Sequence, residues 1–190
     1  MKTLSKRSLI ILVSVTAFIA VAVTVVWAFM YKSTETYNND FTPAQVSCEV
    51  VETFDGTEKS SVKIRNTSNI PAYLRLRIVT YWQDTKGNVV QRESVMPTFT
   101  VDTANWVSMG GDTYCYKLPV DPNGLTPNLL AEGSKIVLEK TSETVNDVVY
   151  EYEQVVEIIA EAIQSKPADA VTSSWKVTMD SDGKTIKSAP

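Results

Sequence analysis

The sequence predicts an all-β protein: a jelly-roll-like antiparallel two-sheet sandwich with little helix, preceded by an N-terminal hydrophobic helix. Two observations carry this prediction. After residue 40, apolar and polar residues alternate with a period of two, which is typical of strands with one buried face. Turn-forming stretches divide the pattern into roughly seven to ten short strands, about 8–12 residues apart, as in sandwiches and jelly rolls.

The N-terminal segment combines a basic flank with a long apolar run. Residues 8–30 form 23 consecutive uncharged positions, and a membrane-spanning helix needs about 20. Val26-Trp27-Ala28 also fits the small-residue rule for cleavage between Ala28 and Phe29. Residues 1–30 are therefore interpreted as a signal peptide or a signal-anchor helix. The basic residues before the run place everything after it outside the cytoplasm; they are Lys2, Lys6 and Arg7.

Residues 31–40 (YKSTETYNND) are polar without apolar periodicity, which predicts a flexible leader. Residues 41–190 are predicted to form a single β-sandwich domain. Its first strand carries Val46, Cys48 and Val50 on one face, and its second carries Val62 and Ile64.

The clearest strand is AYLRLRIVTYW, which follows the turn-forming stretch NTSNIP and precedes the turn DTKGN. Its alternation predicts that Arg75 and Arg77 point to solvent. The opposite, inward set is Ala72, Leu74, Leu76, Ile78 and Trp82.

Short strands are expected within residues 98–101, 106–109, 112–120 and 135–141. The stretch 148–163 is ambiguous, because Glu157 and Glu161 have helical spacing, yet its β-branched and aromatic residues alternate with glutamates. We predict a strand there. One or two helical turns capped by Asp169 should follow Pro167, and a hairpin should form around Asp182-Gly183.

The composition excludes several classes of function. The chain has no histidine, which removes Ser-His-Asp and Cys-His catalytic arrangements and most metallohydrolase sites. Without the three N-terminal basic residues, 15 basic residues stand against 22 acidic ones, a net charge of −7. No basic run is present, so nucleic acid is not an expected partner. We predict no catalytic residues, no cofactor and no metal site.

Several groups have both a functional and a structural interpretation. The acidic pairs Glu151/Glu153 and Asp180/Asp182 resemble glycosidase or calcium-binding carboxylates, but a solvated strand face and a turn explain them better. Asn66-Thr67-Ser68 matches a glycosylation sequon and is expected to build a turn. Five aromatics suit the core better than a sugar-stacking platform; they are Tyr81, Trp82, Trp106, Tyr114 and Tyr116.

The two cysteines, Cys48 and Cys115, belong to an exported chain and so have the option of pairing. Cys48 shares its face with Val46 and Val50, whereas Cys115 lies between two tyrosines that look like the inward pair. This alternation places the two cysteines on different faces of their strands. It favours two separate thiols, at least one of them buried, over a disulfide.

Several stretches together resemble the TasA/camelysin family of Gram-positive exported proteins, which depend on the signal peptidase SipW. Val26-Trp27-Ala28-Phe29 resembles the end of that family's signal peptide, and STETYNNDFTPAQVSCEVVE resembles its leader and first strand. VKIRNTSNIPAYLRLRIVTYWQDTKGNVV and IQSKPADAVTSSWKVTMDSDGKTI resemble later segments, so the resemblance covers most of residues 23–186. The apolar run departs from the family by lacking a Gly-Gly step before the cut.

The resemblance implies a non-enzymatic jelly-roll protein at the bacterial cell surface or in the biofilm matrix. Members assemble by strand complementation, in which the freed N-terminal segment of one subunit joins the sheet of the next. The donor residues would be Tyr31, Thr34, Thr36 and Phe41. The expected partners are further copies or related matrix subunits, the signal peptidase, and the membrane through residues 8–30 if the segment is not cleaved. The alternative is a membrane-tethered extracellular β-sandwich binding module.

Overall fold

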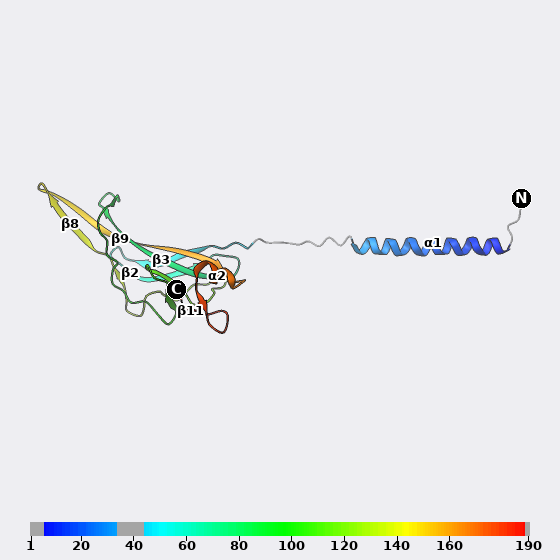
Figure 1. The fold of residues 1–190 in the computed structure, drawn as a ribbon. Coiled ribbons are helices and arrows are strands. Elements are labelled where there is room, and N and C mark those ends of the chain that lie inside the picture. Colours follow the sequence, from blue (N-terminus) through cyan, green and yellow to red (C-terminus); the bar gives the residue numbers. More distant parts are fainter. Residues whose placement is uncertain (1–5, 34–43, 189–190) are drawn as a thin grey trace. The chain divides into compact units, whose positions relative to one another are not determined.

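The computed structural model describes residues 6–33 and 44–188, which belong to two separate compact units, 1–42 and 43–190 (Figure 1). The described part of the first unit is one helix, α1 (Lys6–Ser33). Its described apolar side chains are exposed, Phe18 by 78%. Among the described residues, no helix combines the length and the apolarity that a membrane span requires. α1 includes the first three residues of the predicted leader, and residues 34–43 lie outside the described part.

The second unit confirms the all-β prediction, with two main antiparallel sheets (Figure 1). The first has the order β1-β2-β7, with bounds Cys48–Phe54, Glu58–Asn66 and Ile136–Val137. The second has the order β5-β6-β3-β9-β8, with bounds Trp106–Ser108, Thr113–Tyr116, Ala72–Asp84, Val148–Gln164 and Lys140–Val145. A short strand, β4 (Val89–Val90), pairs with the end of β3.

The main core lies between these two sheets. Val62 and Ile64 of β2 pack with Leu74 and Leu76 of β3, and all four side chains are completely buried. The inward set predicted for β3 is confirmed, since these residues follow the period of two that directs alternate side chains to one face. Trp82 and Trp106 are buried, and Tyr114 and Tyr116 pack against the main core, which confirms their structural interpretation. Tyr81, also expected in the core, is instead only half-buried and lies on the opposite face of β3.

The opposite face of β3 is partly covered, and this corrects one prediction. Tyr73 and Cys115 are buried under α2 (Asp169–Trp175) and the hairpin of β10 (Thr178–Met179) and β11 (Ile186–Ser188). Arg75 therefore does not simply point to solvent: its guanidinium lies 4.6 Å from the centre of the Trp175 ring. The predicted cap is also wrong, because α2 starts one residue earlier and the N-cap position is held by Ala168, without a side-chain hydrogen bond.

β9 forms a single strand of 17 residues, as its alternation predicts, and pairs with β3 over the whole length of β3, from Ala72↔Gln164 to Asp84↔Tyr152. Glu157 and Glu161, whose spacing suits a helix, lie instead on one face of this strand, opposite Val79 and Arg75. The β-branched residues of this stretch thus prevail over the helical spacing of its glutamates.

The sequon asparagine is a structural residue of the turn between β2 and β3. Asn66 is completely buried, and its amide donates hydrogen bonds to the carbonyl oxygens of Ile70 (3.0 Å) and Val120 (2.7 Å). Its side-chain oxygen accepts one from the backbone N–H of Ser68 (2.9 Å). These contacts fix the turn and tie it to a distant loop, which confirms the structural interpretation.

Candidate strand-docking site

β9 has one side without a neighbouring strand. On its first side it pairs with β3 from residue 152 to 164, and on its second side it pairs with β8 only from residue 148 to 153. Within the described residues, no strand pairs with the second side of residues 155–164, and none of their backbone groups takes part in a hydrogen bond on that side. We call this stretch the open edge of β9.

The alternation of hydrogen bonds between β3 and β9 shows which backbone N–H and C=O groups of β9 point to the open edge. In β3, the N–H and C=O of Ala72 bond to Val120, on the side away from β9. In an antiparallel ladder the direction of these groups alternates, so Tyr73, Arg75 and Arg77 bond to β9. Their partners in β9 are Ile163, Glu161 and Ile159, and the residues between those partners direct their N–H and C=O to the open edge: Ile158, Ala160 and Ala162.

A second hydrogen bond independently gives the same direction for the backbone groups of β9. The N–H of Gln154 donates to the carbonyl of Glu139 at 2.8 Å, on the side of β9 away from β3. Even-numbered residues of β9 therefore point their backbone groups to this side, and the pairing stops just where β8 begins. The open edge therefore continues the side of β9 that pairs with β8.

β1 has an open edge of its own. The carbonyls of Ile64 and Val62 in β2 accept bonds from Thr126 (2.9 Å) and Leu129 (2.8 Å), on the side away from β1. By the same alternation, the groups of β1 that point away from β2 are those of Cys48, Val50 and Glu52. β1 is the terminal strand of its sheet.

The two open edges run along one seam between the sheets. At one end, Cys48 packs against the same core cluster as Ala160 and Ala162 and lies within electrostatic reach of Glu161. At the other end, a cavity of about 380 Å³ is lined by residues of β1 and β9, among them Glu52 and Val156. β1 and β9 therefore flank the seam in opposite directions, and no ladder joins them within the described residues.

Charges at the seam are largely compensated. Lys59 is buried, but its ammonium donates to Glu52 at 2.6 Å and lies 4.7 Å from the ring centre of Phe54. What the seam offers is backbone hydrogen bonding beside apolar surface, which suits an extended peptide.

The thiols differ in accessibility, and both are free. Burial, and to a smaller extent the charge of Glu161, raises the pKa of Cys48, and burial raises the pKa of Cys115 to about 12. Because the thiolate is the reactive form, we expect Cys48 to react slowly with a disulfide reagent at pH 8 and faster above pH 9. Cys115 should react only after denaturation. Thiol titration of the native chain, with Cys48→Ser as control, measures this; two rapidly reacting native thiols would contradict it.

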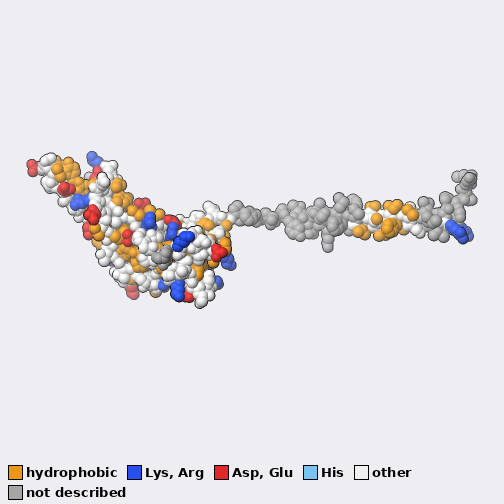
Figure 2. Space-filling model, viewed as in Figure 1, with side chains coloured by type: hydrophobic (Ala, Val, Ile, Leu, Met, Phe, Trp, Pro, Cys, Tyr) orange, Lys and Arg blue, Asp and Glu red, His pale blue; other side chains and the backbone are white. Residues whose placement is uncertain are grey.

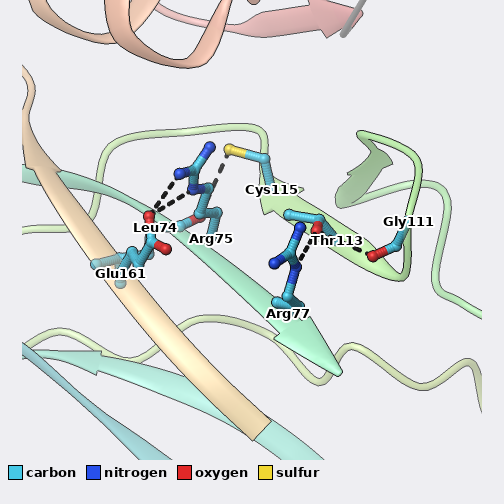
Figure 3. Close-up of polar contacts among 7 residues, drawn as sticks. All are labelled: Leu74, Arg75, Arg77, Gly111, Thr113, Cys115 and Glu161. Atoms are coloured by element: carbon cyan, nitrogen blue, oxygen red, sulfur yellow. Dashed lines mark hydrogen bonds and ion pairs between the residues drawn. The ribbon is translucent and has the colours of Figure 1, made fainter. Parts of the chain in front are cut away.

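A polar cluster on the opposite face of β3 is shown in Figure 3. Arg75 forms an ion pair with Glu161 at 2.5 Å, whereas Arg77 only donates to the Thr113 hydroxyl at 3.4 Å. These residues surround a hollow of about 140 Å³. The neighbouring Cys115 thiol contacts the Leu74 carbonyl at 3.5 Å, and its high pKa leaves it uncharged, so this cluster has no activated nucleophile.

One member of each acidic pair identified in the sequence has clear structural partners. Glu153 accepts a hydrogen bond from Gln83 at 2.6 Å, and Asp182 accepts one from the Thr185 hydroxyl at 2.6 Å and two from backbone N–H groups. These bonds lower the pKa of Asp182 to about 2, as expected for a turn-building carboxylate. In the described part of the chain, no group of three or more acidic or cysteine side chains is arranged to hold a metal ion.

The residues predicted from the sequence lie mainly outside this site. Ala28, Phe29 and Tyr31 belong to α1, and Thr34, Thr36 and Phe41 lie outside the described residues. The sequence predicts a donor segment but not the strand edge that would accept it. One signal for the acceptor was available: β9 is far longer than β8, so part of one side of β9 had to remain without that neighbour.

No protein-family model matches the chain, and no curated protein or solved structure is significantly similar to it.

Proposed function

We propose that this protein is an exported, non-enzymatic structural protein of the bacterial cell surface or biofilm matrix. It acts as a fibre subunit or an accessory to one and assembles by β-strand complementation. The observation that carries this proposal is the open edge of β9, which lies beside the open edge of β1 at one seam of the sandwich. An unpaired edge such as that of β9 is a template for another strand, which monomeric proteins usually cover or shorten. Because Cα atoms of β1 come within 8 Å of β9, β1 has to move aside when a strand pairs there.

An incoming segment gains both hydrogen bonds and apolar contact at the seam. Each backbone hydrogen bond contributes about 0.5–1.5 kcal/mol net, and the outward groups of Ile158, Ala160 and Ala162 alone offer six donors and acceptors. The core beneath them is apolar. A strand of about seven to nine residues therefore has enough contacts to offset its ordering cost and bind stably.

The donor in this proposal is the segment that precedes β1 in a neighbouring copy. It is polar, lacks helical periodicity and contains Thr34 and Thr36 at the i, i+2 spacing that places side chains on one face of a strand. The basic flank and apolar run of residues 1–30 support export. The resemblance to TasA/camelysin proteins supports the same mode of assembly, and the absence of histidine supports a role other than catalysis.

The first test is the N-terminal residue of the protein recovered from its host, determined separately in membranes and in the medium. We expect Phe29 in the medium, together with fibres whose formation depends on protein concentration. Cleavage is required by the proposal because only a freed end can reach another subunit's seam. Fibre formation is measured by light scattering and electron microscopy of the recovered protein.

The opposite result has a definite meaning. A chain that begins at Met1 or Lys2, is found only in membranes and stays monomeric at every concentration would contradict strand donation by a freed end. The membrane-tethered binding module would then be the better account. A chain truncated by design so that it begins at residue 44, which keeps the sandwich but removes the donor, is the matched control and should not polymerise alone.

A further inference from the structure

The second sheet has a bare outer face, defined here as the side chains of β3, β9 and β8 that point away from the main core. Alternation assigns the odd-numbered residues of β3 and β9 to it, because their even-numbered residues form the core. α2 covers one end of this face, where Trp175 lies over Arg75. Beyond Arg77, α2 no longer covers this face, and Gln83, Glu153 and Val155 also line the cavity of about 380 Å³ that Phe54 and Lys59 border.

At its other end the outer face continues onto a projecting ribbon. β8 and β9 are joined by a two-residue turn, Asn146-Asp147, in which both residues have positive φ (49° and 62°), as type I′ hairpins require. Residues 148–151 of β9 pair only with β8, and Figure 1 shows this ribbon extending beyond the other strands. All side chains from 142 to 151 are exposed.

The two faces of the ribbon differ in how far other residues of the chain pack on them. On the core side, the Arg92 guanidinium lies 5.4 Å from the Tyr152 ring centre and 3.9 Å from Glu143, so the chain itself covers the base of the ribbon. On the outer side, Val149 is 61% exposed and no described residue packs over it. Figure 2 shows hydrophobic side chains gathered toward the end of the ribbon. A two-stranded ribbon with exposed apolar residues is only marginally stable in water without a partner.

The outer face carries two complementary hollows. One, of about 480 Å³, is lined by residues of the ribbon that include Glu151 and Glu153, and Glu151 has no ion-pair partner among the described residues. The other is the hollow of about 140 Å³ beside Arg77, whose guanidinium has no carboxylate partner within the described part of the chain. One hollow thus has an unpaired acid and the other an unpaired base.

These two hollows do not meet within one molecule. Arg77 is aligned with Ile159 of β9, eight residues from Glu151 along the same strand, which corresponds to about 26 Å at 3.3 Å per residue. Midway between them, Tyr81 is aligned with Val155. Two copies related by a twofold axis at Tyr81 would bring Arg77 of each copy to Glu151 of the other.

We propose that the outer face is an isologous interface, on which a second copy of this chain stacks sheet against sheet. Tyr81 and Val155 form its apolar centre, and Ile159, which is 44% exposed, lies beside Arg77 near each end. In such a twofold contact every interaction occurs twice, so each Arg77–Glu151 ion pair is duplicated. Lys140, 3.8 Å from Glu153, supplies counter-charge within the larger hollow.

The area of the outer face determines how strongly two copies are expected to bind each other. Ten residue steps along β9 across the two strands β3 and β9 give about 300 Å² per copy, or about 600 Å² in total. This is below the range of stable dimers and typical of weak contacts. The interface is separate from the open edge of β9, so it would join neighbouring strand-linked chains laterally, where many weak contacts act together.

Symmetric cross-linking of the full chain in non-ionic detergent tests this interface. In a Cys48→Ser background, Tyr81→Cys places a thiol at the twofold axis, and Glu132→Cys on an exposed loop is the matched control. With a bis-maleimide reagent that spans about 10 Å, the spacing of sheets stacked face to face, we expect about tenfold more cross-linked dimer for Tyr81→Cys than for the control, because the interface holds the two thiols at high effective concentration. Equal amounts would overturn the proposal.

Charge reversal provides the second measurement. With Tyr81→Cys present, either Arg77→Glu or Glu151→Arg alone should lower the dimer yield about tenfold, since both copies then present like charges. A mixture of the two single variants should restore it, because the mixed dimer has one ion pair of reversed sign and one of the native sign. The mixture also controls for folding. If it cross-links no better than either variant alone, the pairing is wrong, even if strand complementation at the open edge holds.

Discussion

Replacing Ala160 with proline is expected to abolish fibre formation by the processed chain while leaving the sandwich folded. The N–H of Ala160 points to the open edge of β9, away from β3, so proline removes a donor that only an incoming strand uses. Proline is tolerated on the unpaired side of an edge strand. Its ring also occupies the place where the next strand would lie.

The adjacent residue offers a matched control. Ile159 is paired with Arg77, and its N–H belongs to the ladder with β3. Ile159→Pro should therefore cost about 3 kcal/mol or more of the free energy of unfolding, whereas Ala160→Pro should change it by only about 1 kcal/mol. Urea unfolding of both variants, beside light scattering for assembly, separates the two effects. Fibres that form normally with Ala160→Pro would exclude the open edge as the docking site.

The substitution Asn66→Asp is expected to destabilise the domain by about 3–5 kcal/mol at pH 7. The shape of the side chain is preserved, but its two donated hydrogen bonds, to Ile70 and Val120, are lost. A carboxylate oxygen would then face two carbonyl oxygens in a completely buried site, where unpaired charge is strongly unfavourable. Thermal and urea unfolding measure this loss.

Asn69→Asp in the same turn is the control for that substitution. Its side-chain oxygen accepts a hydrogen bond from the N–H of Gln45 at 2.9 Å in an exposed position, and a carboxylate accepts that bond equally well. Its cost should stay within about 0.5 kcal/mol. A similar loss of stability in both variants would show that added negative charge, and not the buried hydrogen bonds of Asn66, is responsible.

Local alternation accounts for what was predictable in the fold. The inward residues of β3, the strand character of residues 148–163 and the hairpin at Asp182-Gly183 all depend on neighbours two to four residues apart. The alternation along each strand also predicts two separate thiols, and Cys48 and Cys115 do pack in different clusters. The wrong expectations, Arg75 as a solvent-facing residue and Asp169 as a cap, both depend on where α2 packs.

By itself, the sequence determined the class of fold, the faces that form the main core and the acidic, histidine-free chemistry of the chain. Only the tertiary structure decided that β9 extends beyond β8 and so leaves an open edge beside β1, and that α2 covers only one end of the outer face. The physical reason is that alternation reports which side chains are buried on the two faces of a strand. The neighbours along a strand's two edges are set by backbone pairing between residues distant in sequence, which a local pattern does not encode.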